Sequence, residues 1–156
     1  MKAHTGKWVG VMLHHTAGST SDKEEQIKKI HMAPPKKWGD IGYHFVLETD
    51  TKTKTSKIVS GRDLKYAGSH AGVNAYNNGY IGVCVPGNYE TGKMPDWLYN
   101  QILGHICHIM KKYSAYGFLG HREVKATACP GKNINLNQIR KDLSAKLGRE
   151  IKAIKL

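Results

Sequence analysis

The chain has 156 residues, a length that suits one domain with its own hydrophobic core. Its 40% hydrophobic and 23% charged residues are ordinary for a globular protein, and no apolar run approaches the roughly 20 residues that span a bilayer. The N-terminus lacks the apolar stretch and cleavage site of a secretory signal. This leaves either a protein held in the cytoplasm or a mature or excised form.

The charge is strongly basic. Lysine and arginine number 24 against 12 acidic residues, a formal net charge of +12. Such an excess attracts polyanions, but the basic residues are spread along the chain rather than clustered. Paired CxxC motifs, an aromatic-rich basic strand and any recognisable nucleic-acid motif are absent, so we expect no nucleic-acid partner.

The first half of the chain predicts a strand, a helix and a hairpin. The segment after residue 7 is short, apolar and partly β-branched, as buried strands are. Ser21 and Glu24 have the spacing of a capping box, and the Pro34-Pro35 pair stops a helix. In chain order we therefore expect a strand at 8–13, a helix from 21 to about 31, and a hairpin of strands at 41–48 and 57–60.

The second half begins with a segment rich in Gly, Asn and Ala at 67–79, which predicts a long surface loop of functional importance. Residues 95–113 carry a broad apolar stripe at 3.6-residue spacing and predict the clearest helix. Strands are expected at 80–85 and around 118–119, and a basic amphipathic helix at 137–147. We expect a single α/β domain over 1–156, with a central mixed β-sheet, about three helices around it, and a monomeric state.

The three cysteines do not form a disulfide pattern, because their number is odd and their spacing is irregular. Cys84 and Cys107 lie in apolar segments and are expected to be buried free thiols. Cys129 differs, because it lies in a loop-like stretch followed by Pro130-Gly131.

Two histidines and one cysteine predict a metal site. His14 ends the first strand, and His121 precedes Cys129 by eight residues. Two imidazoles and one thiolate are zinc ligands, and three protein ligands leave the fourth position open, as in catalytic zinc sites. A competing site would use His105 and His108, at i and i+3 on the long helix, but it has no clear third ligand.

Five motifs occur in a fixed order: HHTAG, GYHF, GSHAG, IGVCVPGN and GHREVKATACPG. Together, from about Trp8 to Gly131, they resemble the zinc-dependent N-acetylmuramoyl-L-alanine amidases of the bacteriophage-lysozyme and peptidoglycan-recognition-protein superfamily. The resemblance implies one zinc ion on His14, His121 and Cys129. It also implies hydrolysis of the amide between N-acetylmuramic acid and L-alanine in bacterial peptidoglycan.

The resemblance also implies further site residues. Tyr43 of GYHF matches a catalytic tyrosine, and alternation along the expected strand would turn it toward the metal. Thr127 stands where some members carry a lysine, and its hydroxyl could donate a hydrogen bond to an oxyanion. His70 and Asn77 are candidates for substrate binding. The chain departs from the phage pattern in YNNGYIG, where Tyr80 replaces a small hydroxyl residue.

Rival functions come from other classes. The same fold could bind peptidoglycan without cleaving it, although the presence of the cysteine ligand favours an enzyme. A zinc-stabilised nucleic-acid binder is suggested only by the charge. Under the leading interpretation, the basic surface would hold the enzyme near anionic wall polymers. A compact amidase without an export signal resembles a phage endolysin that waits in the host cytoplasm before it acts on the cell wall; a bacterial autolysin fragment is the alternative.

Overall fold

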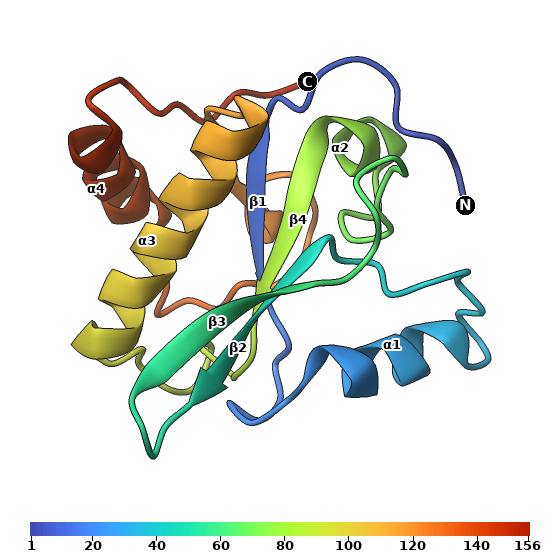
Figure 1. Cartoon of the computed structure of the whole chain (residues 1–156), viewed down its shortest axis with the longest axis horizontal. Helices are drawn as coiled ribbons and strands as arrows, with labels where there is room; N and C mark the ends of the chain where they lie inside the picture. The colour runs from blue at the N-terminus through green and yellow to red at the C-terminus, as the bar shows by residue number, and fades with distance from the viewer.

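The computed structural model describes residues 1–156 and contains five strands and four α-helices (Figure 1). None of the helices is both long enough and apolar enough to cross a membrane. The strands are β1 (Gly10–His15), β2 (Phe45–Asp50), β3 (Thr55–Ser60), β4 (Tyr80–Val85) and β5 (Gly117–Gly120); the helices are α1 (Glu24–Met32), α2 (Asn74–Gly79), α3 (Asp96–Tyr113), the short 3₁₀ helix η1 (His121–Glu123) and α4 (Leu136–Leu147).

The strands form one mixed sheet in the order β3-β2-β4-β1-β5, which confirms the predicted α/β class. β1 pairs in parallel with β4 and β5, and β2 pairs in parallel with β4. Only β3 runs antiparallel, in a hairpin with β2. The carboxyl ends of β1, β4 and β5 therefore meet at one edge of the sheet, the place where open α/β sheets bind ligands.

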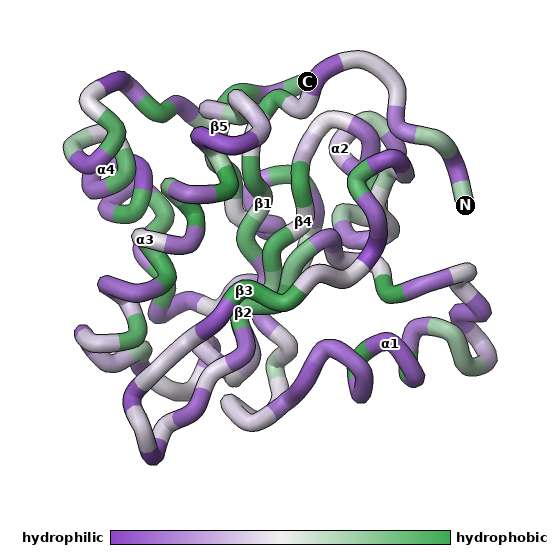
Figure 2. Tube along the Cα trace, in the orientation of Figure 1, coloured by the Kyte–Doolittle hydropathy of each residue, from purple (hydrophilic) through white to green (hydrophobic).

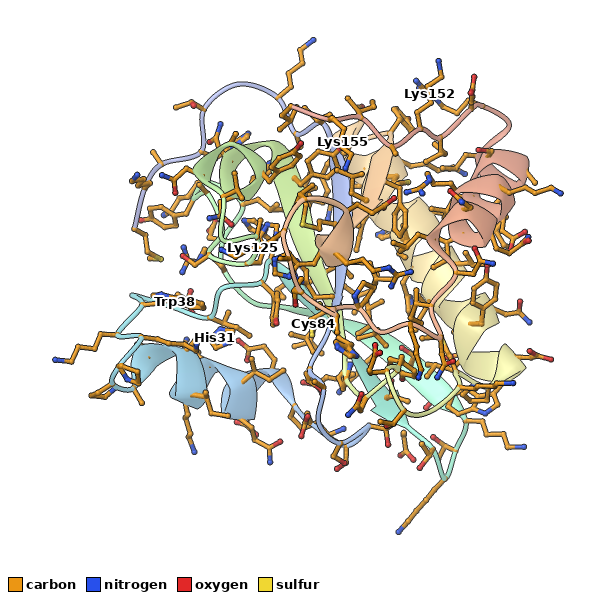
Figure 3. All side chains as sticks on the ribbon, turned by 180° about the vertical axis from the view of Figure 1, so that it is seen from behind. His31, Trp38, Cys84, Lys125, Lys152 and Lys155 are labelled. Carbon is orange, nitrogen blue, oxygen red and sulfur yellow. The ribbon has the colours of Figure 1, made fainter.

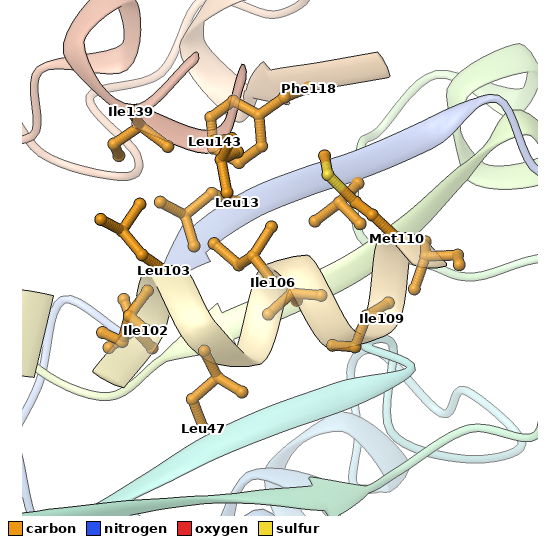
Figure 4. Packing of buried hydrophobic residues seen from close by; sticks show 14 of the residues in the cluster. Leu13, Leu47, Ile102, Leu103, Ile106, Ile109, Met110, Phe118, Ile139 and Leu143 are labelled. Carbon is orange, nitrogen blue, oxygen red and sulfur yellow. The ribbon is translucent and has the colours of Figure 1, made fainter. Parts of the chain in front are cut away.

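Different helices pack on the two faces of the sheet. Figure 1 shows α3 and α4 on one side of β1 and β4, and α1 and α2 on the other. Val11 and Leu13 of β1 join the large core beneath α3, together with Ile106 and Phe118 (Figure 4). Figure 2 shows that β1 and β4 are hydrophobic throughout most of their length, whereas α1 is mostly hydrophilic. Because strand side chains alternate, Met12 points away from α3, toward α2.

One strand starts later than predicted. The alternation over 41–48 suggests a strand there, but β2 begins at Phe45. Most backbone groups of residues 41–43 are bonded to loop backbone and to side chains, and the pairing with β4 starts only at His44, whose N–H donates to the Gly82 carbonyl. Arg62 donates from Nε to the Ile41 carbonyl and from its backbone N–H to the Tyr43 carbonyl, and the Gly42 N–H donates to Nδ1 of His31. The prediction that Tyr43 lies within a strand is therefore wrong; it lies two residues before one.

Two further local predictions are wrong. Residues 67–79 are not loop throughout, because α2 occupies the end of this segment, where Tyr76 is buried against Met12 and Tyr80. The N-terminus of α1 uses Lys23 in place of Ser21: the Gln26 side chain accepts the Lys23 N–H at 2.9 Å. In α2 the burial of Tyr76 outweighs the local sequence pattern, and at the start of α1 the side-chain amide of Gln26 does so.

The stability of the sheet depends on the packing of α3. Ile106 is fully buried in the centre of that core. We expect Ile106→Ala to lower the free energy of unfolding by about 2–5 kcal/mol, because it leaves a cavity. Gly104→Ala, on the exposed face of the same helix with nothing within 4 Å of the added Cβ, should raise it by about 0.5–1 kcal/mol. Urea unfolding measures both; equal midpoints for the two variants would contradict this packing.

Candidate metal centre

The structure brings His14, His121 and Cys129 together from three separate segments. One ligand atom from each lies within 4.8 Å of the other two. His14 lies near the end of β1, His121 begins η1 directly after β5, and Cys129 lies in the loop that follows. The His14 side chain points to the same face as Met12, away from α3, and it is 1% exposed.

Arg122 connects the two segments that carry His121 and Cys129. Its backbone N–H donates to the Cys129 carbonyl at 2.8 Å. Its guanidinium donates to the carbonyls of Gly131 and Ile134, each at 2.7 Å. Gly131 has φ +105°, and a Cβ there would lie 2.3 Å from the backbone of Tyr89. The loop after η1 is thus folded back so that the thiol returns to the histidines.

The spacing of His14 and Cys129 fits zinc. Nδ1 of His14 lies 3.6 Å from Sγ of Cys129. Tetrahedral zinc, with bonds of about 2.0–2.1 Å to nitrogen and about 2.3 Å to sulfur, holds such a pair about 3.6 Å apart. The opposite ring nitrogens are occupied: Nε2 of His14 is 2.9 Å from Nδ1 of His70, and Nε2 of His121 donates to the Ala71 carbonyl at 2.8 Å. Both imidazoles therefore offer Nδ1 to a metal.

The charge states of the three groups follow from burial. Burial, with neighbouring histidines, lowers the pKa of His14 well below its usual value, and burial also lowers the pKa of His121. Both rings are therefore neutral at pH 7. Burial raises the pKa of the Cys129 thiol to about 11, although the His15 N–H and Arg122 oppose the shift. Without a metal, the sulfur retains its proton.

Tyr43 lies beside the metal ligands. Its ring centroid is 5.1 Å from that of His14. Burial raises the pKa of its hydroxyl well above the usual value, and the thiols of Cys84 and Cys129 act in the same direction. The hydroxyl therefore remains protonated at neutral pH and can donate a hydrogen bond.

A row of aromatic rings leads from Tyr43 toward the surface. The centroid of His31 lies 5.5 Å from Tyr43 and 4.8 Å from Trp38. Figure 3 shows His31 and Trp38 next to α1, with Lys125 on a separate segment above them in that view. Nζ of Lys125 donates to the Gly72 carbonyl at 3.4 Å. The three rings thus form one continuous row, from Tyr43 beside His14 to the partly exposed Trp38.

The remaining predicted residues are placed unequally. Thr127 is exposed, and its Oγ1 accepts the Cys129 N–H at 3.3 Å, so its proton stays available. His70 is buried behind His14, and its Nε2 donates to the Tyr80 carbonyl at 3.0 Å. Asn77 turns its Oδ1 toward the backbone of residues 70 and 71. His70 thus contacts the candidate ligand His14, and Asn77 contacts the backbone that carries His70 and Ala71.

The rival histidine pair is not assembled into a site. Nε2 of His105 donates to the Ser56 carbonyl, His108 is exposed, and the one cluster of potential metal ligands is His14, His121 and Cys129. The cysteines are all free, with Cys84 buried as expected and Cys107 only partly so.

Sequence reasoning misses two supporting groups, the guanidinium of Arg122 and the backbone N–H of His15, which lies 3.4 Å from Sγ of Cys129. The side chain of His15 is also engaged, because its Nδ1 accepts the Tyr89 N–H at 3.1 Å. The only sequence signal for these supporting groups is the dipeptide in which each lies, His14-His15 and His121-Arg122. In each dipeptide the first residue is the candidate ligand and the second positions a ligand.

Comparisons with known proteins identify the family of this chain. A family model described as N-acetylmuramoyl-L-alanine amidase matches residues 4–132. Peptidoglycan-recognition protein SC2 of Drosophila melanogaster is 31% identical over 139 residues, 83% of this chain and 71% of that protein. The solved N-acetylmuramoyl-L-alanine amidase LysC from Clostridium intestinale aligns with a TM-score of 0.73 and 26% identity, over 96% of this chain and 95% of that one.

A second structural likeness shows the fold alone. The ectodomain complex of peptidoglycan recognition proteins LCa and LCx, bound to tracheal cytotoxin, aligns with a TM-score of 0.72 at 24% identity, over 90% of this chain and 86% of the other. The family match extends over most of the chain and contains all three potential ligands. The chain therefore belongs to the N-acetylmuramoyl-L-alanine amidase family, in the superfamily that also includes the peptidoglycan recognition proteins.

Proposed function

We propose that the protein is a zinc-dependent amidase that hydrolyses the bond between N-acetylmuramic acid and the L-alanine of the peptidoglycan stem peptide. The observation that carries this proposal is the cluster of His14, His121 and Cys129, with ligand atoms within 4.8 Å of one another. Its two nitrogens and one sulfur leave one of four tetrahedral positions for water or substrate.

The chain supplies a suitable electrostatic environment for the metal. When bound, a zinc ion supplies Lewis-acid chemistry, which lowers the pKa of water and polarises an amide carbonyl. Neutral His14 and His121 and a thiolate at Cys129 together cancel one of its two charges. The His15 N–H, 3.4 Å from Sγ, stabilises the thiolate form of Cys129.

Tyr43 and Thr127 are the proposed hydrogen-bond donors to the oxyanion that forms when the amide carbonyl is attacked. Tyr43 retains its proton because its pKa is raised, so it acts as a donor rather than as a base. Thr127 accepts from the Cys129 N–H and keeps its own O–H free to donate. Donors placed before the reaction stabilise the transition state without reorganising during it.

The two partly exposed rings of the aromatic row, Tyr43 and Trp38, are the proposed platform for the substrate, and the buried His31 lies between them. Sugar rings and peptide segments pack on partly exposed aromatic faces because such faces are apolar yet tolerate polar edges. Peptidoglycan is the ligand class that the relatives' names indicate, and two of them are solved with tracheal cytotoxin. Binding without cleavage is the second candidate, because the relatives include recognition proteins.

Digestion of purified peptidoglycan separates cleavage from binding. We expect the zinc-loaded protein to release stem peptides with a free L-alanine amine, detected by mass spectrometry. Cys129→Ala should lose stoichiometric zinc and this activity together, since it removes one of three ligands. Cys107→Ala, which removes a remote free thiol, should retain both. Retention of peptidoglycan in a pull-down with no new amine from the wild type would establish the binding protein instead.

Removal of the Tyr43 hydroxyl tests its assignment. We expect Tyr43→Phe to keep its zinc and lower kcat by about 10²–10³-fold, the usual effect of losing one oxyanion donor. Tyr113→Phe, which alters a half-buried tyrosine packed on Phe45, should leave kcat unchanged. Steady-state kinetics on a soluble muropeptide measures both variants; equal rates for Tyr43→Phe and wild type would exclude the hydroxyl from the reaction.

Metal binding should release a proton from Cys129. The thiol is protonated because its pKa is about 11, and both histidines are already neutral. At pH 7 we therefore expect Cys129 to release about one proton per zinc, and an apparent affinity that rises about tenfold per pH unit. Calorimetry in buffers of different ionisation enthalpy measures this number.

Cys129→Asp provides the control, because its carboxylate is already deprotonated at pH 7 and should release about one proton fewer than the wild type. Equal release by the two proteins would mean that Cys129 is already a thiolate in the metal-free protein, contrary to its raised pKa.

A further inference from the structure

The ring nitrogens that face away from the metal position are both held by one segment, residues 70–77. Nε2 of His14 meets Nδ1 of His70 at 2.9 Å. Nε2 of His121 meets the carbonyl of Ala71, the next residue, at 2.8 Å. His14 lies in β1 and His121 begins η1, yet their rings contact adjacent residues of the same segment.

One carbonyl determines the direction of this hydrogen-bond chain. The Tyr80 carbonyl can only accept, so Nε2 of His70, 3.0 Å away, must carry a proton. The partners of this buried ring are a carbonyl and another imidazole, with no carboxylate among them, so the ring is neutral and has no second proton. Nδ1 of His70 must then accept, and Nε2 of His14 must donate. His14 is left with a free lone pair on Nδ1, the atom that lies 3.6 Å from Sγ of Cys129.

Two glycines confine the ring of His70. A Cβ on Gly68 would lie 2.4 Å from Cδ2 of His70, and a Cβ on Gly82 would lie 2.5 Å from the same atom. The ring therefore occupies space that any other residue at either position would fill. It is 7% exposed and has both nitrogens bonded. This arrangement fixes the plane of the ring as well as its position.

Asn77 holds the two supporting residues in place. Its Oδ1 accepts the N–H of His70 at 2.9 Å and the N–H of Ala71 at 2.8 Å. One side-chain oxygen thus fixes the backbone at both residues that contact the ligand rings.

We propose that His70 is a positioning residue that selects the tautomer of His14, and that Asn77 holds His70 and Ala71 so that both ligand rings present Nδ1 to the metal. His70 and Asn77 then act through the ligands and not by touching substrate. The tautomer is a property of the metal-free protein, whereas the effect on zinc affinity rests on the proposed function. Groups behind metal-bound histidines commonly change affinity by about 10–100-fold.

The tautomer can be read without any substitution. Long-range ¹H–¹⁵N NMR of the metal-free protein distinguishes a protonated Nε2 from a protonated Nδ1. We expect His14 to be protonated on Nε2 and His70 likewise. A wild-type protein with His14 protonated on Nδ1 would overturn the proposal, because His70 would then not determine the free lone pair.

Variants at position 70 test the cause. His70→Phe keeps a flat ring but removes the acceptor, so His14 should populate both tautomers and zinc should bind about 10–100-fold more weakly in chelator competition. His70→Asn offers an amide oxygen near the place of Nδ1 and should restore most of the affinity.

The matched control is His44→Phe. His44 is equally buried but bonds only to backbone groups, donating to the Tyr66 carbonyl and accepting the Gly82 N–H. This variant should lose stability but leave the His14 tautomer unchanged. Equal effects of the phenylalanine variants at 44 and 70 on the tautomer and on zinc affinity would reduce His70 to a structural residue.

Asn77 provides a second pair of variants that leaves the His70 side chain itself unchanged. Asn77→Asp keeps an oxygen that accepts both N–H groups, so zinc affinity should stay near that of the wild type. Asn77→Leu removes it and should weaken binding. Equal zinc affinity for these two variants would contradict the role of Asn77. If the wild type binds zinc with the expected tautomers but releases no stem peptide, the amidase proposal fails while this inference stands.

Discussion

Two hydrogen bonds to backbone carbonyls, from His70 to Tyr80 and from His121 to Ala71, determine how the candidate metal ligands of this protein are arranged. A carbonyl cannot donate, so each bond places the ring proton on that nitrogen and leaves a lone pair on the opposite one. Both carbonyls belong to segments that the sheet and α2 hold in place. The geometry of the ligands is therefore set by the fold before any metal is present.

The same burial that fixes the rings also removes charge from the site. The pKa values of His14, His70 and His121 are all lowered by burial, so this cluster of imidazoles is neutral. No carboxylate joins the ligand cluster. A metal would therefore bring positive charge into a neutral, partly dry environment, with the Cys129 thiolate as its one ionic partner. In such surroundings the protonated hydroxyl of Tyr43 interacts strongly with a developing negative charge.

The sequence predicts the fold class and the candidate metal ligands better than it predicts the residues that hold those ligands in place. Strand β4 and helix α3 follow from continuous apolar runs and a 3.6-residue stripe, because burial alone specifies them. The three ligands can be proposed because few residue types bind zinc. The start of β2 could not be predicted, since Arg62 and His31 occupy the backbone groups before it. The positions of His70 and Asn77 depend on how their loop folds, with the His70 ring packed against Gly68 and Gly82. No local sequence pattern reveals this packing.

The central claim concerns one metal ion held by two Nδ1 atoms and a sulfur. Crystals of the zinc-loaded protein, measured on both sides of the zinc absorption edge, test it most directly. The account predicts a single anomalous peak bonded to Nδ1 of His14, Nδ1 of His121 and Sγ of Cys129. A peak elsewhere, or one bonded to Nε2 of either histidine, would contradict it.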